Sequence, residues 1–231
     1  MGGYGESGNW TYGDYLSLHD LLSLQGDDRG VSNDEMHFII VHQTFELWFK
    51  QIIRELSEAR DILSQVPVPE DDIPLSVDHL SRTTEIFRLM ANQWTVLETL
   101  TPQGFLAFRD GLGTASGFES YQMREFELLL GLEKEDRLFG VDPLTTFREL
   151  AKRGGEDEKI IKKLEERQTE ISLYESLMRW IERTPIMGSA FGSSDDEITV
   201  KEYIHSHLDS HRQMGEIALE KMSETNQRDI D

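Results

Sequence analysis

The sequence contains no cysteine, so it can form neither a disulfide bond nor a thiolate metal site. It also has no uninterrupted apolar run near the roughly 18 residues that a membrane-spanning helix needs. Its first ten residues lack the basic and apolar regions of a secretory signal. Segments in which apolar and polar residues alternate are scarce, which argues against strands. These absences predict a cytoplasmic protein built without β-structure.

Basic residues are outnumbered: 23 Lys and Arg stand against 44 Asp and Glu, which gives a formal net charge of −21. Such a surface repels the phosphates of nucleic acids and the headgroups of anionic membranes, so we expect neither as a partner. The hydrophobic fraction of 38% is nevertheless sufficient for a packed core. We therefore expect one acidic globular domain over residues 1–231.

Apolar residues recur at helical spacing along the chain, which predicts an all-α fold. The expected helices cover residues 11–25, 32–56 or 32–63, 77–100, 102–113, 118–131, 142–154, 156–183 (as one helix or two) and 199–222. The segments 66–74 and 184–196 are expected to be linkers. The stripe expected to be buried in the helix over 77–100 consists of Val77, Leu80, Thr84, Phe87, Ala91, Trp94 and Leu97.

His42 interrupts an apolar helical run, HFIIVHQTFELWF at residues 37–49. The spacing places its imidazole on the same helix face as Phe38, Phe45 and Phe49. One interpretation is a core histidine whose ring nitrogens bind a neighbouring carbonyl. The other is a single polar group in an aromatic pocket, offering one donor or acceptor to a ligand. Spacing alone leaves both open.

Two further sets of residues could carry chemistry. Arg109 stands near the end of the short helix predicted over 102–113, before the small-residue loop GTASG at 113–117. An arginine there commonly pairs with a surface carboxylate, but it can also hold a substrate carboxylate with two hydrogen bonds. In the last predicted helix, His207 and His211 lie four residues apart, a spacing that can bind a metal ion. Solvent-facing histidines are the simpler interpretation of that pair.

Three blocks resemble one enzyme family in order, spacing and identity: TYGDYLSLHDLLSLQ (11–25), DEMHFIIVHQTFELWFKQIIRELS (34–57) and QWTVLETLTPQGFLAFRDGLGTASGFESYQMREFELLLG (93–131). They are similar to the tryptophan 2,3-dioxygenases, and SLYESLMRWIERTP (172–185) resembles that family's middle region. The family is an all-helical homotetrameric haem enzyme that inserts both atoms of O2 across the indole C2–C3 bond of L-tryptophan, giving N-formylkynurenine. The resemblance implies a helical bundle of this type, b-type haem, L-tryptophan and O2 as substrates, and a homodimer or homotetramer.

The resemblance also implies roles for individual residues. His42 matches the distal histidine that hydrogen-bonds the indole N–H, and Phe38 matches the aromatic residue that packs against the indole. Arg109 matches the arginine that binds the substrate carboxylate. Phe105 stands where family members have Tyr or Phe, and Ser116 matches the serine of the loop over the haem edge. We expect the imidazole of His42 and the guanidinium of Arg109 to converge on one apolar cavity.

The remaining implied roles concern the cofactor and a neighbouring subunit. Trp94 matches a tryptophan in the wall of the haem pocket. Tyr12, Tyr15 and Leu16 match an N-terminal segment that closes the pocket of the neighbouring subunit. Within the single domain, residues 1–30 would thus form an intersubunit segment, residues 31–131 the substrate and haem-pocket helices, and residues 132–231 the C-terminal helices.

One departure from the family's pattern concerns the axial ligand. Family members ligate iron through a proximal histidine in a helix with a pattern like WRxRHxxxVxRxIG, followed by a GTGGS-type loop, and neither pattern occurs in these 231 residues. We expect a chain that is shortened relative to the family. A second polypeptide could supply the missing helices, or His211 or His207 could serve as the axial ligand.

The sequence therefore supports two hypotheses for the function of the chain. The first is a haem-dependent dioxygenase that acts on L-tryptophan. The alternative is a haem-less, non-catalytic helical module or fragment that binds an aromatic amino acid. The absent proximal helix favours the second, whereas the intact substrate residues favour the first.

Overall fold

The computed structural model describes residues 10–113, 116–133, 142 and 144–228 of the chain. Within these residues every regular element is a helix, so the prediction of an all-α fold is confirmed. The chain divides into two compact units, residues 1–174 and 175–231, and each is described by itself. The organisation as a single domain stays a prediction. None of the described helices is long and apolar enough to cross a membrane.

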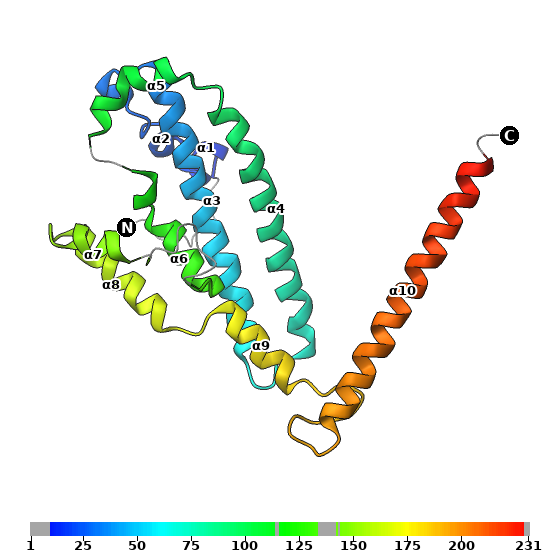
Figure 1. The fold of residues 1–231 in the computed structure, drawn as a ribbon. Helices are drawn as coiled ribbons and strands as arrows, with labels where there is room; N and C mark the ends of the chain where they lie inside the picture. The colour runs from blue at the N-terminus through cyan, green and yellow to red at the C-terminus, as the bar shows by residue number, and fades with distance from the viewer. Residues whose placement is uncertain (1–9, 114–115, 134–141, 143, 229–231) are drawn as a thin grey trace. The chain divides into compact units, whose positions relative to one another are not determined.

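The first unit is built on two long helices, α3 (Asn33–Ser64) and α4 (Ile73–Leu97), which pack side by side (Figure 1). The hydroxyl of Ser32 caps α3 by accepting a hydrogen bond from the amide of Glu35 at 3.1 Å. The apolar residues that α3 buries are Val41, Phe45, Ile52, Leu56, Ala59 and Leu63. Each large side chain among them contributes about 1.5–3 kcal/mol, so α3 carries much of the core.

The buried face of α4 differs from the prediction. The residues that α4 buries are Ser76, Thr83, Ile86 and Met90. The predicted stripe is wrong at four exposed positions: Val77, Thr84, Ala91 and Trp94. The error arises because two buried positions are polar. Thr83 satisfies its hydroxyl by donating to the carbonyl of His79 at 2.9 Å, so its burial costs little.

The N-terminal segment forms two short helices, α1 (Tyr12–Tyr15) and α2 (Leu18–Leu21), and the prediction of one helix over 11–25 is wrong. A capping box between Thr11 and Asp14 begins α1. Ser17 then adopts a φ of 49°, in the left-handed region, and this ends the helical path. A short turn, η1 (Asp27–Arg29), leads into α3.

Two further helices pack against α3. Helix α5 (Pro102–Arg109) is followed by the turns η3 (Asp110–Leu112) and η4 (Gly117–Glu119) and then by α6 (Tyr121–Leu130). The rings of Phe126 in α6 and Phe49 in α3 lie 5.2 Å apart between centroids. The hydroxyl of Ser120 caps α6 by accepting a hydrogen bond from the amide of Met123 at 3.2 Å. Helix α6 therefore begins at Tyr121, three residues after the predicted start at residue 118.

Helices α7 (Thr145–Ala151) and α8 (Glu156–Thr169) form a second small core. Its buried residues are Leu144, Phe147, Ile161 and Leu164. The segment predicted as one charged helix or two over 156–183 is two helices, α8 and α9 (Leu173–Arg183). The second unit contains α10 (Asp196–Arg228), which is longer than the predicted helix over 199–222.

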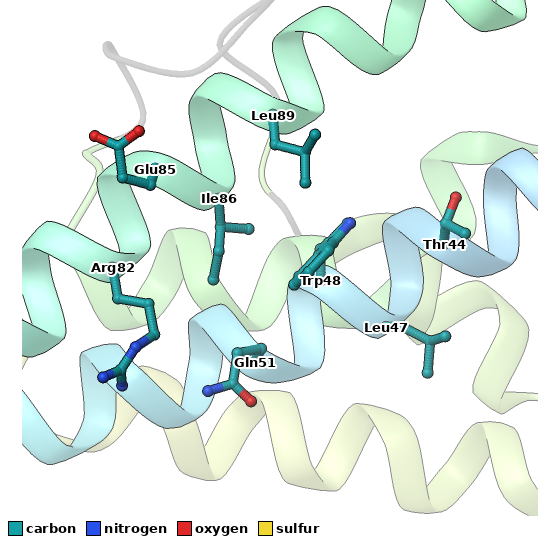
Figure 2. Close-up of a pocket in the computed structure, with 8 residues that line it drawn as sticks. All are labelled: Thr44, Leu47, Trp48, Gln51, Arg82, Glu85, Ile86 and Leu89. Atoms are coloured by element: carbon teal, nitrogen blue, oxygen red, sulfur yellow. The ribbon is translucent and has the colours of Figure 1, made fainter. Parts of the chain in front are cut away.

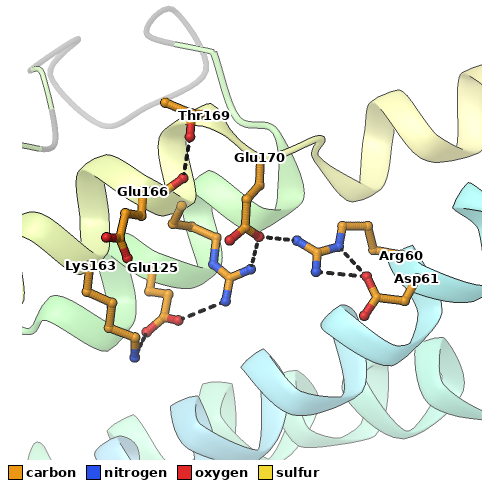
Figure 3. A network of polar contacts seen from close by, with 8 residues as sticks. Arg60, Asp61, Glu125, Lys163, Glu166, Thr169 and Glu170 are labelled. Atoms are coloured by element: carbon orange, nitrogen blue, oxygen red, sulfur yellow. Dashed lines mark hydrogen bonds and ion pairs between the residues drawn. The ribbon is translucent and has the colours of Figure 1, made fainter.

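Charged side chains connect α8 to α6 and α3 (Figure 3). Glu125 of α6 is buried and accepts from Lys163 at 2.7 Å and from Arg167 at 3.2 Å. Arg167 and Arg60 both reach the carboxylate of Glu170, each at 2.5 Å. A buried carboxylate is costly unless it is paired, so this network holds α8 in a defined position on α6.

Candidate functional site

An aromatic cluster joins the start of α3 to α5, with Phe38 at its centre. The centroid of the Phe38 ring lies 4.0 Å from that of His42, 5.9 Å from Phe105 and 5.5 Å from Phe108. Phe105 and Phe108 meet edge to face at 5.4 Å. Such pairs add about 0.5–1.5 kcal/mol each beyond their buried area. The structure therefore brings Phe38, His42 and Phe105 together, whereas their roles toward a substrate stay predictions.

The position of α5 follows from its first turn. Thr101 caps the helix by accepting from the amide of Gly104 at 3.0 Å, and Pro102 occupies the first helical position. Gly104 lies against Asp34 in the first turn of α3, where a Cβ would overlap the carboxylate. A side chain at residue 104 would therefore require the exposed carboxylate of Asp34 to move.

The ring of His42 has a defined tautomer. Its Nδ1 lies 2.8 Å from the carbonyl oxygen of Phe38, one turn earlier in α3. A carbonyl oxygen only accepts, so Nδ1 must carry the proton and donate it. In the neutral imidazole Nε2 is then an acceptor with a free lone pair. The ring therefore binds a neighbouring carbonyl, and a role for Nε2 toward a ligand stays a prediction.

Arg109 ends α5 and is linked to the loop that follows. It lies four residues after Phe105, and its Nη1 donates to the carbonyl of Gly113 at 3.0 Å. In the part of the chain that the structure describes, no carboxylate pairs with it. Ser116 is exposed and its carbonyl accepts from the amide of Glu119 at 2.9 Å, while residues 114–115 lie outside the described residues. The guanidinium is thus held by a backbone carbonyl and not by an acidic side chain.

Trp94 of α4 belongs to a second aromatic group, which meets α3 at Phe45 and Phe49. Its ring lies 5.2 Å from that of Phe45, and its side chain is 54% exposed. Phe45 in turn lies 6.3 Å from Phe49. The stripe of rings on α3 therefore divides between two sets of neighbours, with His42 in the first and Trp94 beside the second.

The predicted intersubunit residues are all exposed. Tyr12 and Tyr15 are 77% and 70% exposed, and Leu16 is 41% exposed. The segment that follows them is attached to α3 beside the site. The side chain of Gln25 donates to that of Gln43 at 2.9 Å, and Gln43 is the residue after His42. The N-terminal segment thus leaves its apolar side chains free while its end is anchored next to the imidazole.

Two other histidines of the first unit are held by neighbours of their own. His37 contacts the carbonyl of Val96 through Nε2 at 3.1 Å, and His79 binds the carboxylate of Glu55 through Nδ1 at 2.6 Å. His211 is exposed on α10. Among the described residues no group of three His, Asp or Glu side chains could hold a metal ion. Within the described part of the first unit, the aromatic cluster therefore contains one histidine, His42, and the axial ligand of a haem stays a prediction.

A groove of about 610 Å³ lies on another face of α3, toward α4 (Figure 2). The residues that line it are Thr44, Leu47, Trp48, Gln51, Arg82, Glu85, Ile86 and Leu89. Neither His42 nor Arg109 is among them. The groove is therefore separate from the aromatic cluster, and the cavity expected between the imidazole and the guanidinium stays a prediction.

A buried carboxylate stands next to this groove. Glu55 is only 3% exposed and binds Arg82 at 2.7 Å, the ring of His79, and the amide of Gln51. Burial acts to raise the pKa of Glu55, but the hydrogen bonds from Arg82, His79 and Gln51 outweigh it and lower that pKa. Glu55 is thus a stable anion that ties α3 to α4.

Phe108 is the member of the cluster that the sequence analysis did not select. It is buried, and it contacts both Phe38 and Phe105. Its spacing was the available signal, because residues three apart in a helix share a face. The resemblance implied roles for Phe105 and Arg109, on either side of this position, but none for Phe108.

Known proteins that are similar to this chain indicate the family to which it belongs. The model of the family described as tryptophan 2,3-dioxygenase matches residues 3–230. The tryptophan 2,3-dioxygenase 2 of Ralstonia nicotianae is 40% identical over 208 residues, which cover 87% of this chain and 55% of the relative. The tryptophan 2,3-dioxygenases of Sorangium cellulosum and Dictyostelium discoideum are 41% and 38% identical, over 78% and 76% of this chain and 45% and 43% of the relatives. The chain spans about half the length of these curated relatives.

Proposed function

The chain belongs to the tryptophan 2,3-dioxygenase family, and from this membership we propose that it serves the reaction of L-tryptophan with O2 to give N-formylkynurenine. Both oxygen atoms enter the product, one on each carbon of the cleaved indole C2–C3 bond. The observation that carries the proposal is the imidazole of His42, which sits against Phe38 with Nδ1 committed to a carbonyl and Nε2 left as an acceptor. The residues of this chain bind and orient the substrate.

In the proposed complex the indole packs against Phe38 and Phe105, and its N–H donates to Nε2 of His42. The phenyl rings supply the apolar area that a flat bicyclic ring needs. The imidazole supplies the one polar partner that an indole requires. Leaving a buried N–H without a partner would cost about 1–3 kcal/mol, so this single hydrogen bond favours indole over a purely hydrocarbon ring.

Arg109 binds the substrate carboxylate in this proposal. Its Nη1 is oriented by the carbonyl of Gly113, which leaves Nε and Nη2 as donors for a bidentate contact. Ser116, in the same loop, would stand at the cofactor edge. Binding both ends of the amino acid restricts the position of the reactive C2–C3 bond, and this restriction lowers the entropic cost of reaction.

Haem would supply the O2 chemistry, with Trp94 in the wall of its pocket. Among the described residues of the first unit, no second histidine joins His42 in the aromatic cluster to serve as an axial ligand. Ligation by His211 stays a prediction. In this proposal the residues of this chain pack against the indole, accept a hydrogen bond from its N–H at Nε2 of His42, and bind the carboxylate.

We also propose a homodimer or homotetramer in which Tyr12, Tyr15 and Leu16 close the pocket of a neighbouring copy. The exposure of these large side chains supports this, because apolar groups left in water favour association. The cytoplasmic location stays a prediction.

The reaction is tested with the purified chain, haem and reductant, followed by L-tryptophan and O2. N-formylkynurenine is then measured by its ultraviolet absorbance. We expect His42→Ala and Arg109→Leu to reduce product formation, and the fully exposed His19→Ala to leave it unchanged. Haem uptake without turnover of L-tryptophan would contradict the proposal. If haem-free chain nevertheless bound L-tryptophan through Arg109, the non-catalytic alternative would replace it.

A further inference from the structure

Helix α10 presents two imidazoles on one side. The ring centroids of His207 and His211 lie 4.9 Å apart with the planes at 65°, and both side chains are exposed. The ring of Tyr203 stacks on His207 at 6.0 Å with the planes at 20°. Residues four apart in a helix lie one above the other, so the three rings form a column. The two imidazoles are therefore adjacent before any ligand arrives.

We propose that His207 and His211 form a two-imidazole site for a late divalent transition-metal ion, with Zn²⁺ and Cu²⁺ as the ions it fits best. Neutral imidazole nitrogens are strong ligands for both ions, at about 2.0–2.1 Å for zinc. One turn of helix separates the two rings, and this spacing lets both bind a single ion. Water completes the coordination of the ion.

The charged side chains near the two imidazoles favour metal ions that prefer nitrogen ligands over those that prefer oxygen. Asp209 lies about 160° around the helix from His207, since each residue turns the chain by about 100°. Its carboxylate is 3.6 Å from Arg212. Ions that prefer oxygen ligands, such as Ca²⁺ and Mg²⁺, therefore find no built cage at this position. The net charge of −21 raises the local concentration of any cation and increases the rate of encounter.

This site shares one residue, His211 as a candidate axial ligand, with the proposed function. It lies wholly within α10, in the second unit, and uses none of the residues of the aromatic cluster. In the described residues no third His, Asp or Glu completes a three-ligand group with the pair. Each imidazole should therefore contribute a large share of the affinity, and removal of either one should be easy to detect.

The experiment titrates the full chain with Zn²⁺ in a calorimeter, without haem or substrate. We expect His207→Ala and His211→Ala each to weaken binding roughly tenfold or more, because one of two chelating ligands is lost. The matched control is His205→Ala, which removes an exposed histidine about 160° around the same helix from His207. Binding by the control should equal that of the unchanged chain.

A second measurement identifies the ligand atoms. With one equivalent of Cu²⁺, the electron paramagnetic resonance spectrum should show coupling to two nitrogens in the unchanged chain and to one in either variant. Circular dichroism checks that α10 stays helical. Equal affinity in all four proteins, or an equal loss in His205→Ala, would assign the ion to the acidic surface in general and overturn the proposal.

Discussion

Removal of the central ring of the aromatic cluster should weaken the packing of α5 on α3. Complete loss of a buried phenyl ring costs about 3–5 kcal/mol. Phe38 is only partly buried, so about half of that is expected, or roughly 2 kcal/mol for Phe38→Ala. The part specific to the contact with Phe105, whose centroid is 5.9 Å away, should be about 0.5–1 kcal/mol.

A double-mutant cycle separates these contributions. The free energy of unfolding in urea is measured by circular dichroism for Phe38→Ala, Phe105→Ala and the double variant. Phe87 is the matched control, because its ring packs on Phe126 in the second aromatic group, where Phe126 also meets Phe49. That group lies about 16 Å along α3 from Phe38. Coupling between Phe38 and Phe105 that is no larger than that between Phe38 and Phe87 would refute the proposed packing of α5.

Three further predictions concern stability. Because its folded pKa is lowered, Glu55 stabilises the chain above its ordinary value of 4.5 and loses this contribution as the pH falls through the folded pKa. The difference in melting temperature between wild type and Glu55→Gln should therefore shrink below about pH 4.5, and a constant difference would contradict this. Leu164→Ala removes a fully buried side chain and should cost about 2–5 kcal/mol in urea unfolding, whereas exposed Leu106→Ala should cost under about 0.5. Gly131 has a φ of 87°, a conformation that is strained for alanine, so Gly131→Ala should cost about 1–2 kcal/mol by the same assay. A neutral effect would show that alanine adopts this conformation without strain.

The sequence was sufficient for those parts of the fold that burial decides. Helix α3 has a regular apolar period over many turns, and it forms where that period predicts it. The buried face of α4 was missed because two of its buried residues, Ser76 and Thr83, are polar, and the hydrogen bond from Thr83 to the carbonyl of His79 is not encoded in a hydrophobicity pattern. The break between α1 and α2 was missed for a similar reason, since it depends on the backbone conformation of Ser17.

For the candidate site, the sequence indicated the residue types but not their partners. The spacing around His42 permitted both a core histidine and a ligand-binding one. Only the contact between Nδ1 and the carbonyl of Phe38 shows which nitrogen is available. Likewise the alternatives for Arg109 were a surface carboxylate or a substrate, and neither anticipates the carbonyl of Gly113. Hydrogen-bond partners depend on distances between atoms, and residue spacing does not determine those distances.

The two ends of the proposed substrate depend on different parts of the structure. The carbonyl that orients His42 belongs to α3 itself, four residues earlier, so the acceptor at Nε2 persists as long as that one helix is formed. The position of Arg109, in contrast, depends on the packing of α5 and on its hydrogen bond to the carbonyl of Gly113. In the proposed complex, recognition of the indole N–H therefore depends on α3 alone, whereas recognition of the carboxylate also requires α5 to pack on α3.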